Sequence, residues 1–184
     1  AGIDMAILAM QVPDVYFQKA TLERQSDEFA LAEQVFGEKT KQFHSYREAL
    51  LRKNPDMSYY LYDGKFIVAS INVVPIDREG IELFKQGERG WYLGDHVLQF
   101  EPGEPLEVII IDMMTTPLAP LNRRHEYAMR LLLAVSKQLI EWGEQGVDIK
   151  RIYASGGTPD GRRILETARF TFLGEPQPGR NIYE

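Results

Sequence analysis

Residues 106–135, LEVIIIDMMTTPLAPLNRRHEYAMRLLLAV, contain the two segments that decide the fold. The first ten residues are almost continuously apolar, which is typical of a strand buried on both faces in the centre of a sheet. From about residue 123 to residue 144, apolar side chains recur at helical spacing, which predicts a long amphipathic helix. A strand is predicted next, at residues 148–156, so this passage should be a right-handed parallel crossover.

The rest of the chain supplies further helices and strands. In chain order, we predict a strand or helical arm at Ile3–Phe17, helices at 26–37 and 41–53, two strands within 57–76, a short helix at 77–87, a helix at 158–169 and a strand at 170–175. Asp63-Gly64 is a strong hairpin signal between the two middle strands, and Pro75 is expected to mark the end of the second. Gly37, Gly87 and Gly146 are expected to end helices.

Composition and charge indicate a globular protein that does not bind nucleic acid. The chain has 184 residues, 44% of them apolar and 26% charged, which fits one globular domain over residues 1–184. It begins with Ala rather than Met, so it also fits a processed chain or a piece excised from a longer protein. The net charge of −6 disfavours nucleic acid as a partner, because phosphate contacts need clustered cations.

The residue types also constrain location and metal chemistry. No apolar run reaches the ~18–20 residues that a membrane helix needs, and the first residues do not resemble a signal peptide. The lack of cysteine excludes disulfides and thiolate metal sites, and it favours a cytoplasmic location. His44, His96 and His125 are far apart in the sequence, so we expect no metal site.

The order of the predicted elements resembles the GNAT (Gcn5-related N-acetyltransferase) superfamily over about residues 25–175. Residues 66–76, FIVASINVVPI, look like the family's third strand, with Ala69 at a glycine position. Residues 112–135 look like the fourth strand running into the signature helix, and residues 160–170, DGRRILETARF, resemble the closing helix. The resemblance implies an α+β fold with a central mixed sheet flanked by helices.

The resemblance also implies acetyl-CoA as a cosubstrate. In this family the fourth strand leaves backbone groups free for pantetheine, and Met113, Met114 and Thr115 occupy those positions here. A plain buried strand end is the alternative. The family's pyrophosphate loop, Q/R-x-x-G-x-G/A at a helix N-terminus, corresponds to residues 123–128. The residues implied in cofactor binding there are Arg123, Arg124, His125, Tyr127 and Ala128.

Glu126 stands where this loop has its first glycine. It brings a Cβ atom and a negative charge toward a diphosphate, at very roughly 3 kcal/mol for each pair of like charges. The alternative is that Glu126 stabilises the dipole near a helix start, while Arg124 and His125 are solvated residues of the first turn. A shift of the frame by one residue would also remove Glu126 from the loop.

Acyl transfer to an amine also needs a base, and many GNAT members use a tyrosine as the acid for the CoA thiolate. The resemblance places Leu165 at that tyrosine and Arg169 at a glycine. Tyr153 is the nearest substitute acid, with ring packing as the alternative. Glu107 and Asp112 are the candidate bases, and strict alternation along a strand places them on opposite faces. The alternative role for Asp112 is an ion pair with an arginine or a cap to a nearby loop.

The stretch between the predicted third and fourth strands is longer than the turn common in this fold. Long structured insertions often carry function, so it could line the acceptor side of the site. The alternative is that its aromatic side chains bury a satellite core. These side chains are Phe84, Trp91, Tyr92, His96 and Phe100.

Two functional interpretations follow. The first is an N-acyltransferase that moves acetyl from acetyl-CoA to the primary amine of a small molecule or peptide, an assignment by fold-level analogy. The second is a non-catalytic GNAT-like module that binds a ligand or partner within a larger regulatory protein. Glu126 and Leu165 favour the second interpretation, and the arginines at 123 and 124 favour the first. Both interpretations are compatible with a homodimer.

Overall fold

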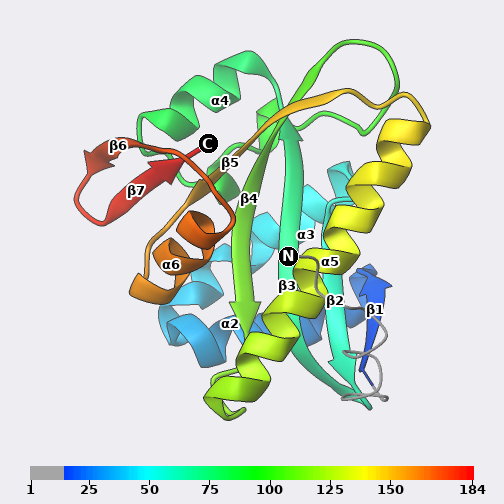
Figure 1. Ribbon diagram of the computed structural model, residues 1–184, viewed down its shortest axis with the longest axis vertical. Helices are drawn as coiled ribbons and strands as arrows, with labels where there is room; N and C mark the ends of the chain where they lie inside the picture. The colour runs from blue at the N-terminus through cyan, green and yellow to red at the C-terminus, as the bar shows by residue number, and fades with distance from the viewer. Residues whose placement is uncertain (1–14) are drawn as a thin grey trace.

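Seven strands form one mixed sheet in the order β1-β2-β3-β4-β5-β7-β6 in the computed structural model, which describes residues 15–184 (Figure 1). The strands are β1 (Val15–Lys19), β2 (Ser58–Asp63), β3 (Phe66–Ile76), β4 (Leu106–Thr115), β5 (Ile149–Ser155), β6 (Phe172–Gln177) and β7 (Arg180–Tyr183). The α-helices are α2 (Gln25–Phe36), α3 (His44–Lys53), α4 (Arg78–Lys85), α5 (Leu121–Glu144) and α6 (Pro159–Thr167). The 3-10 turns are η1 (Leu22–Arg24), η2 (Glu38–Phe43), η3 (Gly90–Tyr92) and η4 (Gly94–His96).

The central strand is β4, as its apolar sequence predicts. It pairs antiparallel with β3 and parallel with β5, so the predicted parallel passage through α5 is confirmed. The predicted α+β class, a mixed sheet flanked by helices, is confirmed as well. Most of the predicted element at Ile3–Phe17 lies outside the described residues, and its end belongs to β1. Within residues 15–184 no helix is both long enough and apolar enough to span a bilayer.

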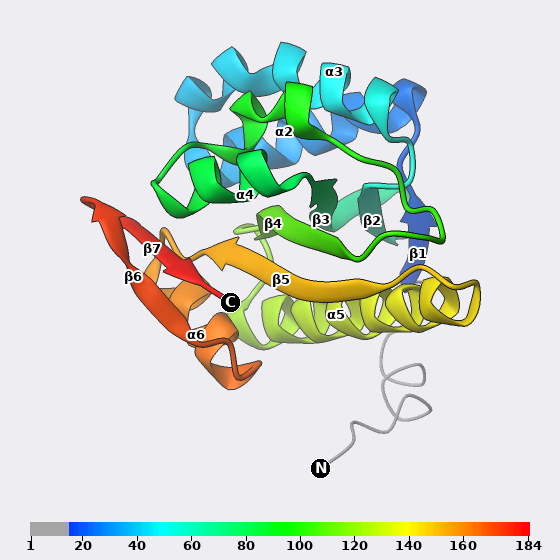
Figure 2. The same cartoon turned by 90° about the horizontal axis from the view of Figure 1, so that it is seen from above.

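Helices cover both faces of the sheet (Figure 2). Helices α2, α3 and α4 lie on one face, and α5 and α6 lie on the other. The core beneath α3 and α4 contains Tyr60, Ile109 and Ile111, whereas the core beneath α5 contains Val108 and Leu131. Each face buries its own set of side chains because successive residues of a strand point to opposite sides.

Some predicted boundaries were wrong. Pro75 does not end its strand but pairs with Val108 inside β3. It is tolerated because β2 reaches only as far as Asn72 along β3, so no ladder bond from the Pro75 nitrogen is needed on that side. We call the stretch between β3 and β4, residues 77–105, the insert. It contains α4, which corresponds to the helix predicted at 77–87, followed by two 3-10 turns at residues 90–96, where loose strand character was expected. Strand β7 was missed, although Pro178-Gly179 before it is a turn signal.

Helices α5 and α6 end in the same motif with different residues at its left-handed position. Gly146 has φ +92° after α5, and the Val147 N–H donates to the Trp142 carbonyl at 2.9 Å. After α6, Arg169 has φ +64°, and the Phe170 N–H donates to the Leu165 carbonyl at 2.9 Å. Both arrangements are Schellman caps, in which glycine usually occupies the left-handed residue.

We expect Arg169→Gly to raise the free energy of unfolding by about 0.5–1 kcal/mol, because glycine adopts positive φ without a Cβ penalty. Chemical denaturation measures this change. Arg169→Ala is the matched control: it removes the same side chain but keeps Cβ, so it should not stabilise the protein. Equal effects of the two variants would show that the side chain, and not the backbone conformation, sets the stability at this cap.

Candidate functional site

Strand β4 separates from β5 halfway along its length. The last pair in register is Ile110 with Ala154, whereas β4 continues beside β3 as far as Thr115. Within the described residues no strand pairs with the β5-facing edge of residues 111–115. Backbone N–H and C=O groups on such an edge are available to an extended ligand.

A β-bulge lies on β4 at the beginning of this opening. Asn72 pairs with Ile111 and Ser70 pairs with Met114, so β4 carries one more residue than β3 between these pairs. Asp112 lies in the bulge with φ +50°, a conformation that is uncommon for residues other than glycine. The Asn72 side-chain Nδ2 donates to the Ile111 carbonyl at 3.1 Å and so satisfies a backbone group beside the bulge.

The bulge corrects the predicted face of Asp112. Strict alternation places it opposite Glu107, Ile109 and Ile111, but its side chain contacts α3 on the same face as Ile111. Asp112 Oδ2 accepts a hydrogen bond from Arg47 Nη2 at 2.5 Å. The same oxygen accepts one from Trp91 Nε1 at 3.0 Å. The alternative role predicted for Asp112, an ion pair with an arginine, is therefore what the structure contains.

Arg47 connects Asp112 to a second, fully buried carboxylate. Its side chain is 1% exposed, and Nη1 donates to Glu28 Oε1 at 3.2 Å. Glu28 also accepts from the Tyr60 hydroxyl at 2.9 Å and from Asn72 Nδ2 at 3.0 Å. Because every partner of Glu28 is a donor, these bonds offset part of the cost of burying its charge.

This buried network was missed by the sequence analysis. A signal for it exists, because Arg47 shares a helical stripe with Leu50 and Leu51, both buried in α3. A cation on an apolar stripe indicates a buried partner. The partner itself could not be found, since Asp112 lies 65 residues further along the chain.

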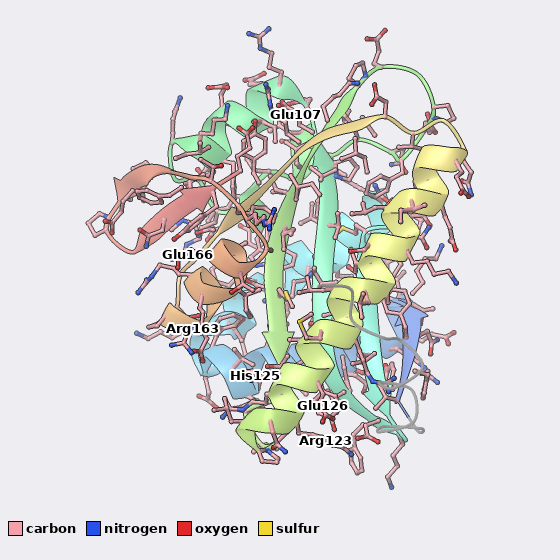
Figure 3. All side chains as sticks on the ribbon, in the orientation of Figure 1. Glu107, Arg123, His125, Glu126, Arg163 and Glu166 are labelled. Carbon is pink, nitrogen blue, oxygen red and sulfur yellow. The ribbon has the colours of Figure 1, made fainter. Side chains whose placement is uncertain are left out.

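Glu107 and Tyr153 lie together, but away from Asp112. The Tyr153 hydroxyl donates to Glu107 Oε1 at 3.0 Å, and Arg151 Nη1 donates to the same oxygen at 3.3 Å. Burial, with a smaller contribution from Glu107, raises the pKa of Tyr153. Four residues of strand lie between Glu107 and Asp112, which places them about 15 Å apart. Glu107 is thus at the far end of β4 from the opening (Figure 3).

The three residues predicted to offer backbone groups lie at the opening. Met113 packs toward the core beneath α5, and Met114 packs against Leu31 and Ala32 of α2. Met114 and Thr115 pair with β3 on one edge. The other edge faces the gap toward β5, so the predicted placement of these residues is compatible with a bound arm.

The predicted pyrophosphate loop is helix instead. Helix α5 begins at Leu121, two residues before the motif, and the Arg124 N–H already donates to the Pro120 carbonyl at 3.0 Å. The amide groups of residues 125–128 therefore lie inside the helix and are not presented as a loop. The helical amides without an intrahelical acceptor are those of Leu121, Asn122 and Arg123, and no side chain caps them at Pro120.

Side chains of the motif mostly serve the fold. Arg123 Nη1 donates to Glu126 Oε2 at 3.1 Å, and this hydrogen bond raises the pKa of Arg123. Tyr127 is 4% exposed, and its hydroxyl donates to Asp63 Oδ2 at 2.6 Å. Burial and this hydrogen bond raise the pKa of Tyr127 to about 12. Ala128 is also buried. The side chains of Tyr127 and Ala128, two of the residues implied in cofactor binding, therefore pack in the core.

Known proteins were compared with the chain in sequence and in structure. No family model and no curated protein matches the sequence. An agmatine N-acetyltransferase matches in structure with a TM-score of 0.58 at 9% identity, over 92% of this chain and 96% of that one. N-acetylglutamate synthase from Neisseria gonorrhoeae, complexed with coenzyme A and N-acetyl-glutamate, matches at 0.55 and 14% identity, over 92% and 34%. A GCN5-related N-acetyltransferase from Kribbella flavida matches at 0.52 and 13%, over 88% and 34%.

The chain has the GNAT fold. It spans about a third of the Neisseria and Kribbella chains, which are longer proteins. The GNAT resemblance drawn from element order is confirmed at the level of the fold. Two residues in α6 and its cap differ from the residues that GNAT members have at these positions. Leu165, predicted at the family's tyrosine, packs with Ala154 and Tyr183, and Arg169, predicted at a glycine, has the positive φ that suits glycine.

The GNAT fold implies acetyl-CoA, and the backbone of this chain fits that group in two places. The open edge of β4 can pair with the pantetheine arm, and the uncapped first turn of α5 presents amides and a positive dipole end to a diphosphate. The side chain of Glu126 does not fit a diphosphate, because it forms an ion pair with Arg123 and adds a negative charge near the first turn of α5. The backbone therefore fits the cofactor better than the side chains do.

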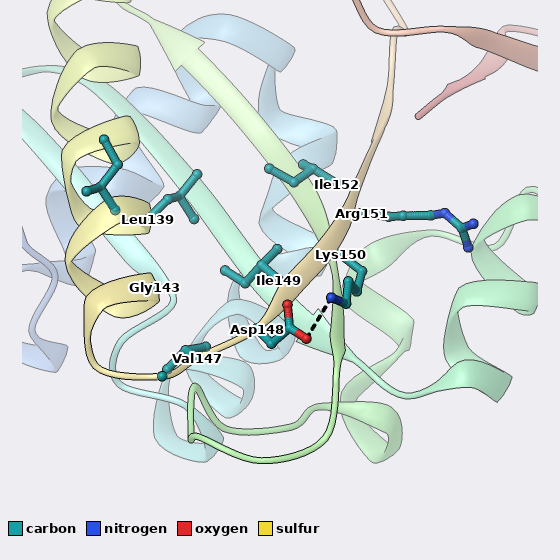
Figure 4. Close-up of a pocket in the computed structure, with 10 residues that line it drawn as sticks. Leu139, Gly143, Val147, Asp148, Ile149, Lys150, Arg151 and Ile152 are labelled. Atoms are coloured by element: carbon teal, nitrogen blue, oxygen red, sulfur yellow. Dashed lines mark ion pairs between the residues drawn. The ribbon is translucent and has the colours of Figure 1, made fainter.

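Two pockets lie away from this opening. A pocket of about 580 Å3 lies between the end of α5 and β5, lined by residues that include Leu139, Val147 and the ion pair of Asp148 with Lys150 (Figure 4). A pocket of about 380 Å3 lies between Lys85 and the β6–β7 hairpin. The first pocket contains none of the predicted site residues, and neither does the second.

Proposed function

We propose that this chain is an acetyl-CoA-dependent N-acyltransferase that acts on a primary amine. One observation carries the proposal: β4 bulges at Asp112 and then separates from β5, which leaves a backbone edge beside the first turn of α5. Residues 113–115 would hold the pantetheine arm by backbone hydrogen bonds, and the amides of residues 121–123, with Arg124 nearby, would hold the diphosphate. The cosubstrate supplies an activated acetyl thioester when it is bound.

Among the predicted bases, Asp112 suits the reaction better than Glu107. Asp112 lies at the opening, and Oδ1 is engaged by neither Arg47 nor Trp91, which both bind Oδ2. It would accept the proton that the acceptor amine loses as the new amide bond forms, directly or through water. Glu107 is bonded to Tyr153 and Arg151, about 15 Å along the strand. Tyr153 is therefore not placed to protonate the leaving thiolate, and we assign that proton to water.

Thermal denaturation with acetyl-CoA tests the proposal. Ligand at 100 times its dissociation constant should stabilise the protein by about 2.7 kcal/mol, and a thiol reagent should detect free CoA when an amine is added. No stabilisation at millimolar acetyl-CoA would refute the proposal.

Glu126→Gln should tighten acetyl-CoA binding by about 3- to 10-fold, because it removes a negative charge and releases Arg123. Isothermal titration calorimetry measures the dissociation constant. The control is Glu141→Gln, the same change near the C-terminal end of α5, which should leave affinity unchanged. If both variants bind acetyl-CoA as the unchanged protein does, the diphosphate does not bind at the start of α5.

A second function is favoured by Glu126 and Leu165. Glu126 stands where GNAT members have a glycine that lets the diphosphate approach, and Leu165 stands where many of them have the tyrosine acid. A non-catalytic module that binds a ligand or a partner would need neither the glycine nor the tyrosine. Such a module would be stabilised by CoA or another ligand but would release no thiol with any amine. The thiol assay thus separates the two functions.

A further inference from the structure

Strand β7 and the segment just beyond α4 meet on the face of the sheet that holds Asp112. Arg180 begins β7, and its Nη2 donates to the Glu88 carbonyl, just beyond α4, at 3.1 Å. Its guanidinium carbon lies 6.0 Å from the centre of the Phe84 ring. The β6–β7 hairpin and α4 lie side by side in both ribbon views (Figures 1 and 2). Arg180 therefore bridges β7 to the insert on the face that also holds Asp112.

Arg180 is a half-buried cation that has no anionic hydrogen-bond partner among residues 15–184. Its Nε atom is buried and has no hydrogen-bond partner in the described part of the chain. The pKa of Arg180 is lowered, first by burial and then by repulsion from Arg89. The carboxylates of Asp112 and Glu88 act in the opposite direction but do not outweigh these two effects. The two nearby carboxylates thus do not compensate this charge, since one of them, Asp112, is already paired with Arg47.

Arg89 adds a second cation in the segment just beyond α4. Its guanidinium carbon lies 5.5 Å from the centre of the Phe43 ring, and among residues 15–184 it forms no ion pair. The Glu88 side chain accepts from the Arg89 backbone N–H at 2.9 Å instead of meeting its guanidinium. Arg89 is exposed and directly follows Glu88, whose carbonyl binds Arg180, so the two arginines flank the same short segment. An added anion would stabilise two guanidinium groups placed in this way.

The position of the pair relative to the opening indicates which substrate it would meet. The first turn of α5, where the diphosphate is proposed to bind, belongs to the opposite face of the sheet from α3 and α4. A thioester reaching through the gap between β4 and β5 would thus present its acetyl carbon to the face that holds Asp112, Trp91 and Arg180. The acceptor amine must approach from that face.

We propose that the acceptor is a small amine that also carries a carboxylate, with the carboxylate bound by Arg180 and Arg89 and the amine directed toward Asp112. This inference rests on the proposed transferase function and names its substrate class. Arginine suits the task because its planar fork binds a carboxylate through two parallel hydrogen bonds. The amine nitrogen attacks the acetyl carbon, the carbon–sulfur bond breaks, and the ammonium proton passes to Asp112 or to water as CoA leaves as a thiol.

Matched amines test the substrate class. We would measure thiol release with the ω-amino acids from β-alanine to 6-aminohexanoate, and with the n-alkylamine of equal length for each. The best amino acid should exceed its alkylamine in kcat/KM by about 10- to 100-fold, the range for a hydrogen bond between charged groups. Arg180→Met should lower kcat/KM for the amino acid by about 10- to 100-fold more than it lowers kcat/KM for the alkylamine, and Arg180→Lys should keep part of the preference. Arg78→Met on α4 is the control for net charge and should change neither value.

A binding measurement separates this inference from the proposed function. Calorimetry with 4-acetamidobutyrate, an unreactive carboxylate of the product type, should give binding that Arg180→Met weakens by about 10-fold or more. If no amine releases thiol but this binding is seen, the transferase function fails and the carboxylate site stands. If amines react equally well with and without a carboxylate, or if 4-acetamidobutyrate binds Arg180→Met as it binds the unchanged protein, the inference is overturned.

Discussion

Replacing Arg47 with methionine should lower the free energy of unfolding by about 3–5 kcal/mol. Methionine fills a similar volume but leaves Glu28 buried without its cation and removes the partner of Asp112. Both side chains of the Arg47–Glu28 pair are 1% exposed, so water cannot replace the lost contacts. Urea denaturation followed by circular dichroism measures the change.

Two further variants make this result specific. Arg52→Met, on the same helix, removes an arginine that is 61% exposed and paired with Glu48, so it should cost no more than about 0.5 kcal/mol. Adding Glu28→Gln to Arg47→Met should recover part of the loss, because it removes the unpaired buried charge. Equal costs for Arg47→Met and Arg52→Met would contradict the importance of this network.

Trp91→Ala should also cost about 3–5 kcal/mol, because it empties a large buried site. Trp91 is 5% exposed, its ring lies 4.1 Å from the guanidinium carbon of Arg47, and its Nε1 donates to Asp112. Loss of this side chain removes the contact between the insert and the β4 bulge. We therefore expect faster amide exchange at residues 112–114 in the variant, measured by hydrogen exchange, together with the loss of stability.

Conservative and neighbouring substitutions serve as controls. Trp91→Phe keeps most of the packing but loses the hydrogen bond to Asp112, so it should cost about 1.5–3 kcal/mol. Tyr92→Ala removes the next aromatic residue of the insert, which is 45% exposed, and should cost less than about 1 kcal/mol. A cost for Trp91→Ala as small as that for Tyr92→Ala would mean that the insert does not support the bulge.

The aromatic insert illustrates how far local patterns reach. Its aromatic composition predicted either a satellite core or a wall of the acceptor side, and most of these side chains pack in the two main cores of the protein. Phe84 and Trp91 belong to the main core beneath α4, and the Phe100 ring lies 3.8 Å from that of Trp142. Tyr92 is exposed. Composition could not assign these roles, because each depends on what the insert packs against after folding.

Strand β4 and helix α5 could be predicted because each carries its own periodicity over ten residues or more. The start of α5 was predicted to within two residues, at about residue 123 instead of Leu121. The motif comparison did not show that the helix already includes all of residues 123–128, with the Pro120 carbonyl accepting from the Arg124 N–H. Proline immediately before the first helical turn costs no hydrogen bond, so residues 121–125 continue the helical pattern toward the N-terminus.

The bulge at Asp112 was outside the reach of pattern analysis for a different reason. A bulge adds one residue to one strand, and no particular residue type is required for it. Here it depends on side chains from α3, β3 and the insert, which are distant in sequence. Asp112 lies at the opening, but its face and its partners could be learned only from the tertiary structure.

The bulge has a consequence for how this chain can vary during evolution. Before it, Ile109 and Ile111 face α3 and α4 and must stay apolar, whereas after it Asp112 and Met114 face that side. Up to the bulge the odd-numbered residues of β4 face α3 and α4, and from Asp112 onward the even-numbered residues do, so different positions must stay apolar in the two halves of the strand. Deletion of Asp112 would leave Ile111, Met113 and Met114 in strict alternation, so the side chains beyond the bulge would keep their faces. The loss would be confined to the contacts of Asp112 with Arg47 and Trp91.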